Sequence, residues 1–371
     1  MHVTFCLLLT IAQASASPSP SPAPSATPTY SLSGVFSFYA LHTNDVNATG
    51  ALDTPEGADY ASRADLSSAM LTVAKNTGWW RFGITAGTYA FPVVGESVNP
   101  TTQAGANTSL YHYFPSAYVA FVPNDQLTIS LGQLATLLGQ EDGFTYQNVN
   151  IQRGLVWAAE PVFSRGVRVA YTVGKLSSDL EYNDGYYSGN HRAVEGLAGW
   201  APNSNTDFQL AFISPQADTP GNITSSIANK TEFDVMLTQQ LGKLQILPYV
   251  LFIRSPGSTD LGYARSESAT GDVLLANYAF NSVYSLGARY EWFVDHSGLT
   301  DTSPNADFVG YGPGSRAASV TVTPEYKQGF FFARAEFSAV NVLNATPGLA
   351  FGAGGSSRTQ TRTLAEVGVQ F

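Results

Sequence analysis

The sequence predicts an all-β protein, a transmembrane antiparallel β-barrel of about 16 strands with short periplasmic turns and long extracellular loops. Three observations predict it. Apolar and polar residues alternate in many segments, the links between these segments alternate between short and long, and only 12% of the 371 residues are charged. Apolar residues that face lipid one at a time need neither many charges nor long apolar runs. No apolar run reaches 18 residues, which argues against helical membrane spans.

The first residues predict an exported chain. Residues 5–12 form a short apolar core, and Ala14-Ser15-Ala16 follows as a small-x-small cleavage signal, so we expect residues 1–16 to be a signal peptide. Residues 17–29 are rich in Pro and Ser and predict an extended periplasmic leader. This leader is either a disordered spacer or an arm that binds a partner. Residues 30–371 are expected to form the outer-membrane barrel.

Alternation with a period of two predicts the individual strands. Trp80, Phe82 and Ile84 share one face of a strand whose other face carries Arg81 and Thr85. The same pattern recurs along the chain in residues 127–132, 167–173, 207–212, 232–238, 284–292 and 363–371.

The links between the strands predict the topology. Seven links have the composition of tight hairpin turns, namely 76–78, 123–125, 174–175, 202–205, 242–243, 281–282 and 327–329. Eight longer polar stretches lie between them, at 43–64, 92–112, 138–164, 187–192, 215–230, 255–270, 294–317 and 343–360. Seven turns and eight loops join sixteen strands. An even number of strands places both ends of the chain on the same side of the membrane, as in outer-membrane barrels.

Aromatic residues predict two interfacial girdles. The periplasmic girdle would contain Trp79, Trp80, Trp200, Tyr278, Phe280, Tyr284, Tyr326, Phe330, Phe331 and Phe371. The outer girdle would contain Tyr89, Phe91, Tyr182, Trp292 and Phe293. Phe371 ends the last alternating segment, which we expect to pair with residues 31–41 and so close the barrel. By analogy with other outer-membrane barrels, Phe371 is also the expected signal for the barrel insertion machinery.

The charged residues predict what faces the lumen, because a charge on the lipid face costs about 2 to 4 kcal/mol at the midplane. Strand parity places on the inner face Arg81, Arg168, Arg289, Arg334 and Arg362, together with Asp179, Glu181, Glu195, Asp207, Glu232, Asp234, Glu291, Glu325, Glu336 and Glu366. The excess of acids predicts a mild cation preference. Neighbouring Arg and carboxylate pairs, such as Arg334 with Glu336, more often brace the wall than select a solute.

The loop between the fifth and sixth strands, residues 138–164, is the candidate constriction. It offers Glu141, Asp142, Arg153 and Glu160 to the channel, and residues 149–160 are the one stretch that could turn helical. The alternative is an outer loop whose charges are solvated.

Other site classes have weak support. The net charge of −10 argues against nucleic acid as a partner. The histidines lack the spacing of a zinc site, and His296-Ser297 is the nearest match to a barrel-wall hydrolase. We therefore expect no catalytic residue, no metal and no cofactor, and the chain is not expected to be an enzyme.

Short motifs resemble a known family, the OmpL-like β-barrel porins. They are Gly132-Gln133-Leu134-Ala135-Thr136-Leu137-Leu138-Gly139-Gln140-Glu141, Phe144-Thr145-Tyr146, Arg153-Gly154-Leu155, Glu160-Pro161, Ser164-Arg165-Gly166-Val167-Arg168 and Gly287-Ala288-Arg289-Tyr290-Glu291. Many relatives place an aromatic residue and His before the Gly-Val-Arg, where this chain has Phe163-Ser164-Arg165. The resemblance implies a bacterial outer-membrane porin and assigns no binding residue.

The predicted function is a water-filled channel for passive diffusion of small hydrophilic solutes or ions in the bacterial outer membrane. The expected partners are outer-membrane lipid, the insertion machinery and two further copies in a homotrimer. One alternative is a barrel that acts as a surface adhesin or anchor without an open pore. Another is a soluble secreted β-domain, which would stay soluble without detergent.

Overall fold

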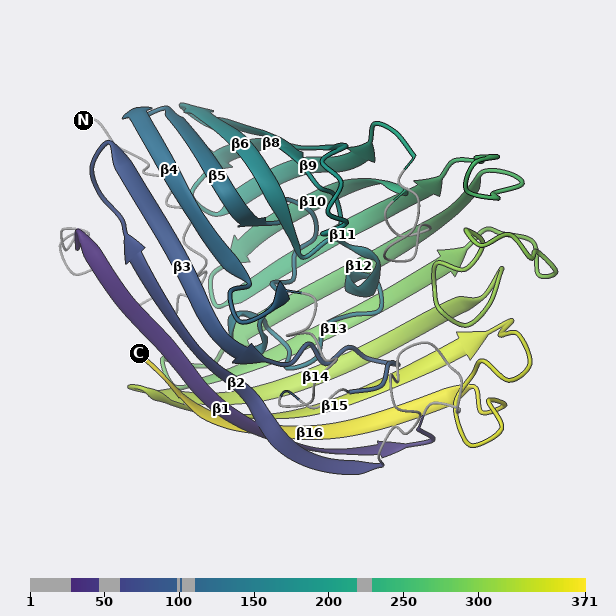
Figure 1. Ribbon diagram of the computed structural model, residues 1–371. Helices are drawn as coiled ribbons and strands as arrows, with labels where there is room; N and C mark the ends of the chain where they lie inside the picture. The colour runs from purple at the N-terminus through teal and green to yellow at the C-terminus, as the bar shows by residue number, and fades with distance from the viewer. Residues whose placement is uncertain (1–27, 47–60, 99–100, 102–110, 219–228) are drawn as a thin grey trace.

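The computed structural model describes residues 28–46, 61–98, 101, 111–218 and 229–371, and this part of the chain forms sixteen antiparallel strands in one closed barrel (Figure 1). The predicted fold class is confirmed. The predicted signal peptide and residues 17–27 of the leader lie outside the described residues. The strands are β1 (Tyr30–Asn44), β2 (Ser62–Lys75), β3 (Trp80–Tyr89), β4 (Ser116–Asn124), β5 (Leu127–Ala135), β6 (Phe163–Val173), β7 (Leu176–Asn183), β8 (Ala193–Asn203), β9 (Thr206–Pro215), β10 (Thr231–Leu241), β11 (Leu244–Ser255), β12 (Glu267–Ala279), β13 (Tyr284–Asp295), β14 (Arg316–Gln328), β15 (Phe331–Leu343) and β16 (Thr359–Gln370).

The two faces of the wall differ because side chains alternate along each strand. In β13, Tyr290 is 50% exposed on the outer face, whereas Arg289 and Glu291 on the inner face are buried. All the acids and arginines assigned to the lumen by parity share the register of these inner residues. The inner part of the barrel contains two short 3-10 turns, η1 (Thr145–Gln147) and η2 (Trp157–Ala159). Among the described residues no helix is long and apolar enough to cross a membrane.

Short and long connections lie at opposite ends of the barrel, as Figure 1 shows. Among the two-residue turns, those between β6 and β7 and between β10 and β11 contain Gly174 and Gly242 with φ of 61° and 62°. Positive φ at glycine matches the twist of two-residue hairpins. The long connections gather at the other end, and two of them, which follow β3 and β5, reach inward-facing residues of the wall.

The seam between β1 and β16 closes the wall. The register runs from Val35 opposite Gln370 to Asn44 opposite Thr361. Phe371 extends it, because its N–H donates to the Gly34 carbonyl at 3.0 Å and its carbonyl accepts from the Gly34 N–H at 2.9 Å. The paired segment of β1 therefore lies three residues further along than predicted. The first residues of β1 pair with β2 alone, since tilted strands in a barrel are staggered.

The aromatic prediction is right for the residues named at the short-turn end and, at the other end, for Tyr182, which is 53% exposed. Trp79, Trp200 and Phe330 are exposed at the short-turn end, as an outward girdle requires. At the other end the assignment of Tyr89, Phe91 and Phe293 to an outer girdle is wrong. Tyr89 and Phe293 are buried on the inner face, and Tyr89 and Phe91 lie 5.4 and 6.1 Å from the ring of Phe144, in a loop inside the barrel. Because this loop provides the ring of Phe144 as an apolar partner, aromatic residues at this end can face inward.

Candidate functional site: a loop inside the barrel

The connection between β5 and β6, residues 136–162, lies inside the barrel and is called the inner loop. It starts and ends on one wall, yet Glu141 pairs with Arg289 of β13 at 2.6 Å. The Ile151 N–H donates to Glu336 of β15 at 2.5 Å. Strands β13 to β15 lie on the opposite side of the strand order from β5 and β6, so the inner loop crosses the lumen.

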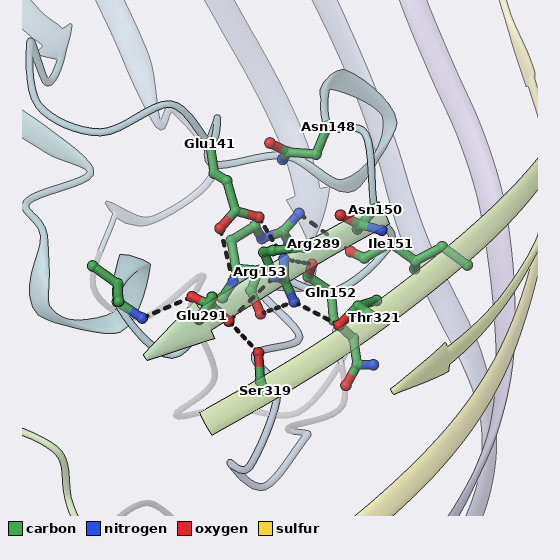
Figure 2. Close-up of polar contacts among 12 residues, drawn as sticks. Glu141, Asn148, Asn150, Ile151, Gln152, Arg153, Arg289, Glu291, Ser319 and Thr321 are labelled. Carbon is green, nitrogen blue, oxygen red and sulfur yellow. Dashed lines mark hydrogen bonds and ion pairs between the residues drawn. The ribbon is translucent and has the colours of Figure 1, made fainter. Parts of the chain in front are cut away.

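Arg289 holds the centre of the inner loop, as Figure 2 shows. Its guanidinium pairs with Glu141 at 2.6 Å and with Glu291 at 3.2 Å, and all three side chains are buried. It also donates to the carbonyls of Gln152 at 2.7 Å and Arg153 at 3.1 Å. We call Arg289, Glu141 and Glu291 the β13 clamp. A buried ion pair offsets the cost of removing its charges from water only when further hydrogen bonds reach both partners. Here the two carbonyls bind the terminal nitrogens of Arg289, and the Gly154 N–H binds Glu141 at 2.9 Å.

Glu291 binds the backbone of the inner loop. It accepts hydrogen bonds from the N–H groups of Leu155 at 3.0 Å and Val156 at 3.1 Å. A Cβ atom on Gly154 would lie 2.0 Å from Glu291 Oε1. Only glycine therefore permits this close approach of the loop to the wall.

Strands β15 and β16 provide a second attachment. Glu336 accepts from the Gln152 N–H at 3.0 Å as well as from Ile151. Arg334 donates to the Thr145 carbonyl at 2.9 Å and pairs with Glu366, which also accepts from the Thr145 hydroxyl at 3.0 Å. Glu336, like Glu291 of β13, accepts from backbone N–H groups that a helix would bond to its own carbonyls. The predicted helix over residues 149–160 is accordingly reduced to the single turn η2.

Arg153 joins the inner loop to residues 90–98, which follow β3. Its backbone donates to the Pro92 carbonyl at 2.8 Å and accepts from the Val94 N–H at 3.0 Å. Its fully buried guanidinium lies 5.8 Å from the ring centre of Phe91 and 5.6 Å from that of Trp157. Burial lowers the pKa of Arg153 to about 10. In the described part of the chain no carboxylate lies within ion-pair distance of it.

The sequence reasoning missed an apolar inner wall. Leu138, Leu155 and Val156 of the inner loop belong to one buried cluster with inward residues of the wall. The wall residues of this cluster include Ile213, Met236, Tyr249, Leu251, Ile253, Val273 and Leu275. The signal is present in β11, whose residues 246–253 are mostly apolar on both faces instead of alternating. A strand that faces lipid on one side and an apolar loop on the other needs apolar residues on both faces.

The other predicted site residues lie apart from the β13 clamp. Arg168 of β6 pairs with Glu181 at 2.5 Å and donates to the Ala135 carbonyl just before the inner loop. Arg81 is half-buried on the inner face of β3. In the inner loop, the Asp142 side chain is exposed, whereas Glu160 is buried beside β10.

Comparisons with known proteins agree with this architecture. A family model described as "Putative beta-barrel porin-2, OmpL-like" matches residues 29–371. An anion-selective porin from Comamonas acidovorans is similar in structure, with a TM-score of 0.59 and 12% identity, over 92% of this chain and 99% of that one. The trimer form of OmpT, an outer-membrane protein of Vibrio cholerae, has a TM-score of 0.59 and 11% identity over the same shares. No curated protein matches the sequence.

Proposed function

The chain belongs to the OmpL-like β-barrel porin family and is an outer-membrane porin, and from this premise we propose that it is a bacterial channel for passive diffusion of small hydrophilic solutes or ions, narrowed by the inner loop. The observation that carries the proposal is the course of the inner loop from β5 across to β13 and β15. A sixteen-strand barrel is too wide for wall side chains to fill, so a loop attached to the opposite wall sets the width of the water path.

A mild cation preference is the second part of the proposal. The inner face carries more carboxylates than arginines, and Arg168, Arg289 and Arg334 each pair with a carboxylate. The paired charges cancel, and the remaining acids leave a negative field in the lumen. The anion selectivity of the Comamonas porin does not transfer at 12% identity.

Planar-bilayer recording tests both parts. We expect the purified protein to give discrete conductance steps, and a reversal potential under a salt gradient with the sign of a cation-preferring pore. Anion selectivity would contradict the charge argument alone. A protein that inserts, shows heat-modifiable gel migration and yet conducts no ions would instead favour an adhesin or anchor. The apolar packing of the inner loop against the wall gives that second candidate its support.

Asp142 is expected to make the selectivity depend on pH. Its side chain is accessible to solvent, but many protein atoms lie around it. The resulting desolvation raises the pKa of Asp142 to about 6, although the positive charge of Arg153 acts to lower it. Because the raised pKa lies between 5 and 8, the carboxylate loses its charge as the pH falls through this interval, and cation preference should fall with it. Reversal potentials at pH 8 and pH 5 measure the change.

Two variants control this prediction. Asp142→Asn should show the weaker cation preference at both pH values. Asp125→Asn, which removes an exposed acid from the turn between β4 and β5, should behave as the wild type. An Asp142→Asn protein with an unchanged pH response would refute the assignment.

A homotrimer is the remaining proposal. OmpT of Vibrio cholerae has a trimer form, and the similar barrel of this chain offers an outer wall for side-by-side packing. Light scattering in detergent would distinguish a trimer from a monomer.

A further inference from the structure

The end of the inner loop meets β10 in a buried group of acids. Glu160 is 6% exposed, and Glu232 and Asp234 are fully buried. The Gly139 N–H donates to Asp234 Oδ2 at 2.8 Å, and a Cβ atom on Gly139 would lie 2.0 Å from Glu160 Oε2. Glu160 and Asp234 therefore contact the same glycine. We call Glu160, Glu232 and Asp234 the carboxyl cluster.

The carboxyl cluster contains oxygen atoms without hydrogen-bond partners. Both oxygens of Glu160, Oδ1 of Asp234 and Oε1 of Glu232 are buried and unpartnered. The Tyr249 hydroxyl of β11, on a side chain that is 1% exposed, is also unpartnered and lies beside Glu160 outside hydrogen-bond geometry. Buried polar atoms in native proteins usually have a partner. A proton shared among these oxygens would supply the missing donor.

The surrounding charges do not balance the carboxyl cluster. Lys230 is its only close cation in the described residues, and its ammonium donates to the Ala159 carbonyl and lies 4.9 Å from the ring centre of Tyr186. Tyr186 donates to Glu232. The further charged groups that act on the cluster are acids, Glu195 of β8 and Glu141 of the inner loop. Three ionised carboxylates beside one ammonium would leave two uncompensated buried charges, which is strongly unfavourable.

Protons, and not a metal ion, fit this geometry. Among the described residues no three His, Cys, Asp or Glu side chains are placed so that they could hold a metal ion. A carboxyl group can instead lose its charge by binding a proton. Glu160 is the member of the cluster that belongs to the inner loop.

We propose that Glu160 is a proton-operated latch, which holds the end of the inner loop against β10 when protonated and releases it when ionised. Burial first, and then the charges of Asp234 and Glu232, raise the pKa of Glu160 well above its usual value. The latched loop thus binds the proton more tightly than the released loop. The loop is therefore fully latched at a pH below the ordinary pKa of Glu, and the latch is lost as the pH rises through the raised pKa of Glu160.

The latch has a readout that does not require conduction. Ala159 is buried and Ala158, its neighbour in the inner loop, is exposed. Each can be replaced by cysteine one at a time, because the single native cysteine, Cys6, lies in the predicted signal peptide. The ratio of maleimide labelling at residue 159 to that at residue 158 reports exposure of the buried position, and the same ratio in Glu160→Gln corrects for the pH dependence of the two thiols. Between pH 6 and pH 10 we expect this labelling ratio to rise. The expected rise is about tenfold for each pH unit by which the pKa of Glu160 is higher in the latched loop than in the released loop.

The control variants separate the latch from general alkaline loosening. With Glu160→Gln, which stays neutral, the ratio should remain at its low-pH value. With Asp207→Asn, which changes a half-buried inner acid hydrogen-bonded to Gln209, the rise should persist. An equal rise in the wild type and in Glu160→Gln would overturn the proposal, and so would no rise in the wild type.

Widening of the pore on release rests on the proposed function and is tested separately. In planar bilayers, conductance per channel should rise with pH in the wild type and stay constant in Glu160→Gln. If the labelling ratio responds as expected but no current flows at any pH, the latch stands and the channel proposal fails. If current flows and the labelling ratio is unresponsive, the channel stands and the latch fails.

Discussion

Replacing Arg289 with alanine is expected to detach the inner loop from β13 and to lower the free energy of unfolding by about 3 to 5 kcal/mol. The change removes the only cation of the β13 clamp and leaves Glu141 and Glu291 buried together. It also removes donors to the carbonyls of Gln152 and Arg153. Thermal unfolding in detergent, followed by heat-modifiable gel migration, measures the loss. A wider channel should appear as larger conductance steps.

Two comparisons make this result specific. Arg81→Ala removes an arginine from the same inner face, but one that is half-buried and forms no ion pair within the described residues, so a small effect is expected. Burial raises the pKa of Glu141, and Arg289 opposes this shift. Adding Glu141→Gln to Arg289→Ala should therefore recover part of the stability, because one uncompensated carboxylate is gone. Equal losses for Arg81→Ala and Arg289→Ala would contradict the role of the β13 clamp.

Deletion of Phe371 is expected to lower the amount of barrel assembled in the outer membrane severalfold or more. Phe371 forms two backbone hydrogen bonds with Gly34 at the seam, at 2.9 and 3.0 Å. Its ring also lies over Gly34, since a Cβ atom there would be 2.8 Å from Phe371 Cζ. Unpaired backbone groups in a lipid environment cost several kcal/mol each. Heat-modifiable protein in outer-membrane fractions, relative to total protein, measures assembly.

Conservative replacements separate the backbone from the side chain. Phe371→Tyr and Phe371→Trp keep both hydrogen bonds and an aromatic ring, and should assemble nearly as well as the wild type. Phe371→Ala keeps the hydrogen bonds alone and should be intermediate. Normal insertion of the protein that lacks Phe371 would show that neither the seam contacts nor a recognition signal at this residue governs assembly.

The wall could be predicted from the sequence because its physical constraint is local. Each strand meets lipid on one face, so Tyr290 must alternate with Arg289 and Glu291. Gly174 and Gly242 mark hairpins because few other residues accept their positive φ. The inner position of the arginines and acids assigned to the lumen follows from the same alternation, which is why strand parity gives these positions without knowledge of the topology.

The candidate site could be predicted only in part, because its contacts are not local. The sequence identifies Glu141, Arg153 and Glu160 as loop charges, but nothing in their spacing indicates that Glu141 meets Arg289, 148 residues away. The inner position of Tyr89 and Phe293 was missed for a related reason. An aromatic residue near the end of a strand can lie at the membrane–water interface or pack inside the barrel. Which of the two positions it takes depends on a loop that is distant in the sequence.

The attachments of the inner loop have a consequence for the order of folding. The inner loop follows β5 in the sequence, yet its partners Arg289, Glu336 and Glu366 belong to β13, β15 and β16. Thr145, for example, is separated from Glu366 by 221 residues. Contacts between residues so distant in sequence form late, because chain entropy must first be lost. A nascent barrel that still lacks its last four strands can bind the ends of the loop through β8 and β10, but it lacks the partners of the central part of the loop. The contacts with Glu336 and Glu366 therefore form only once the wall is nearly complete, so the fully attached loop is expected only after β15 and β16 are in place.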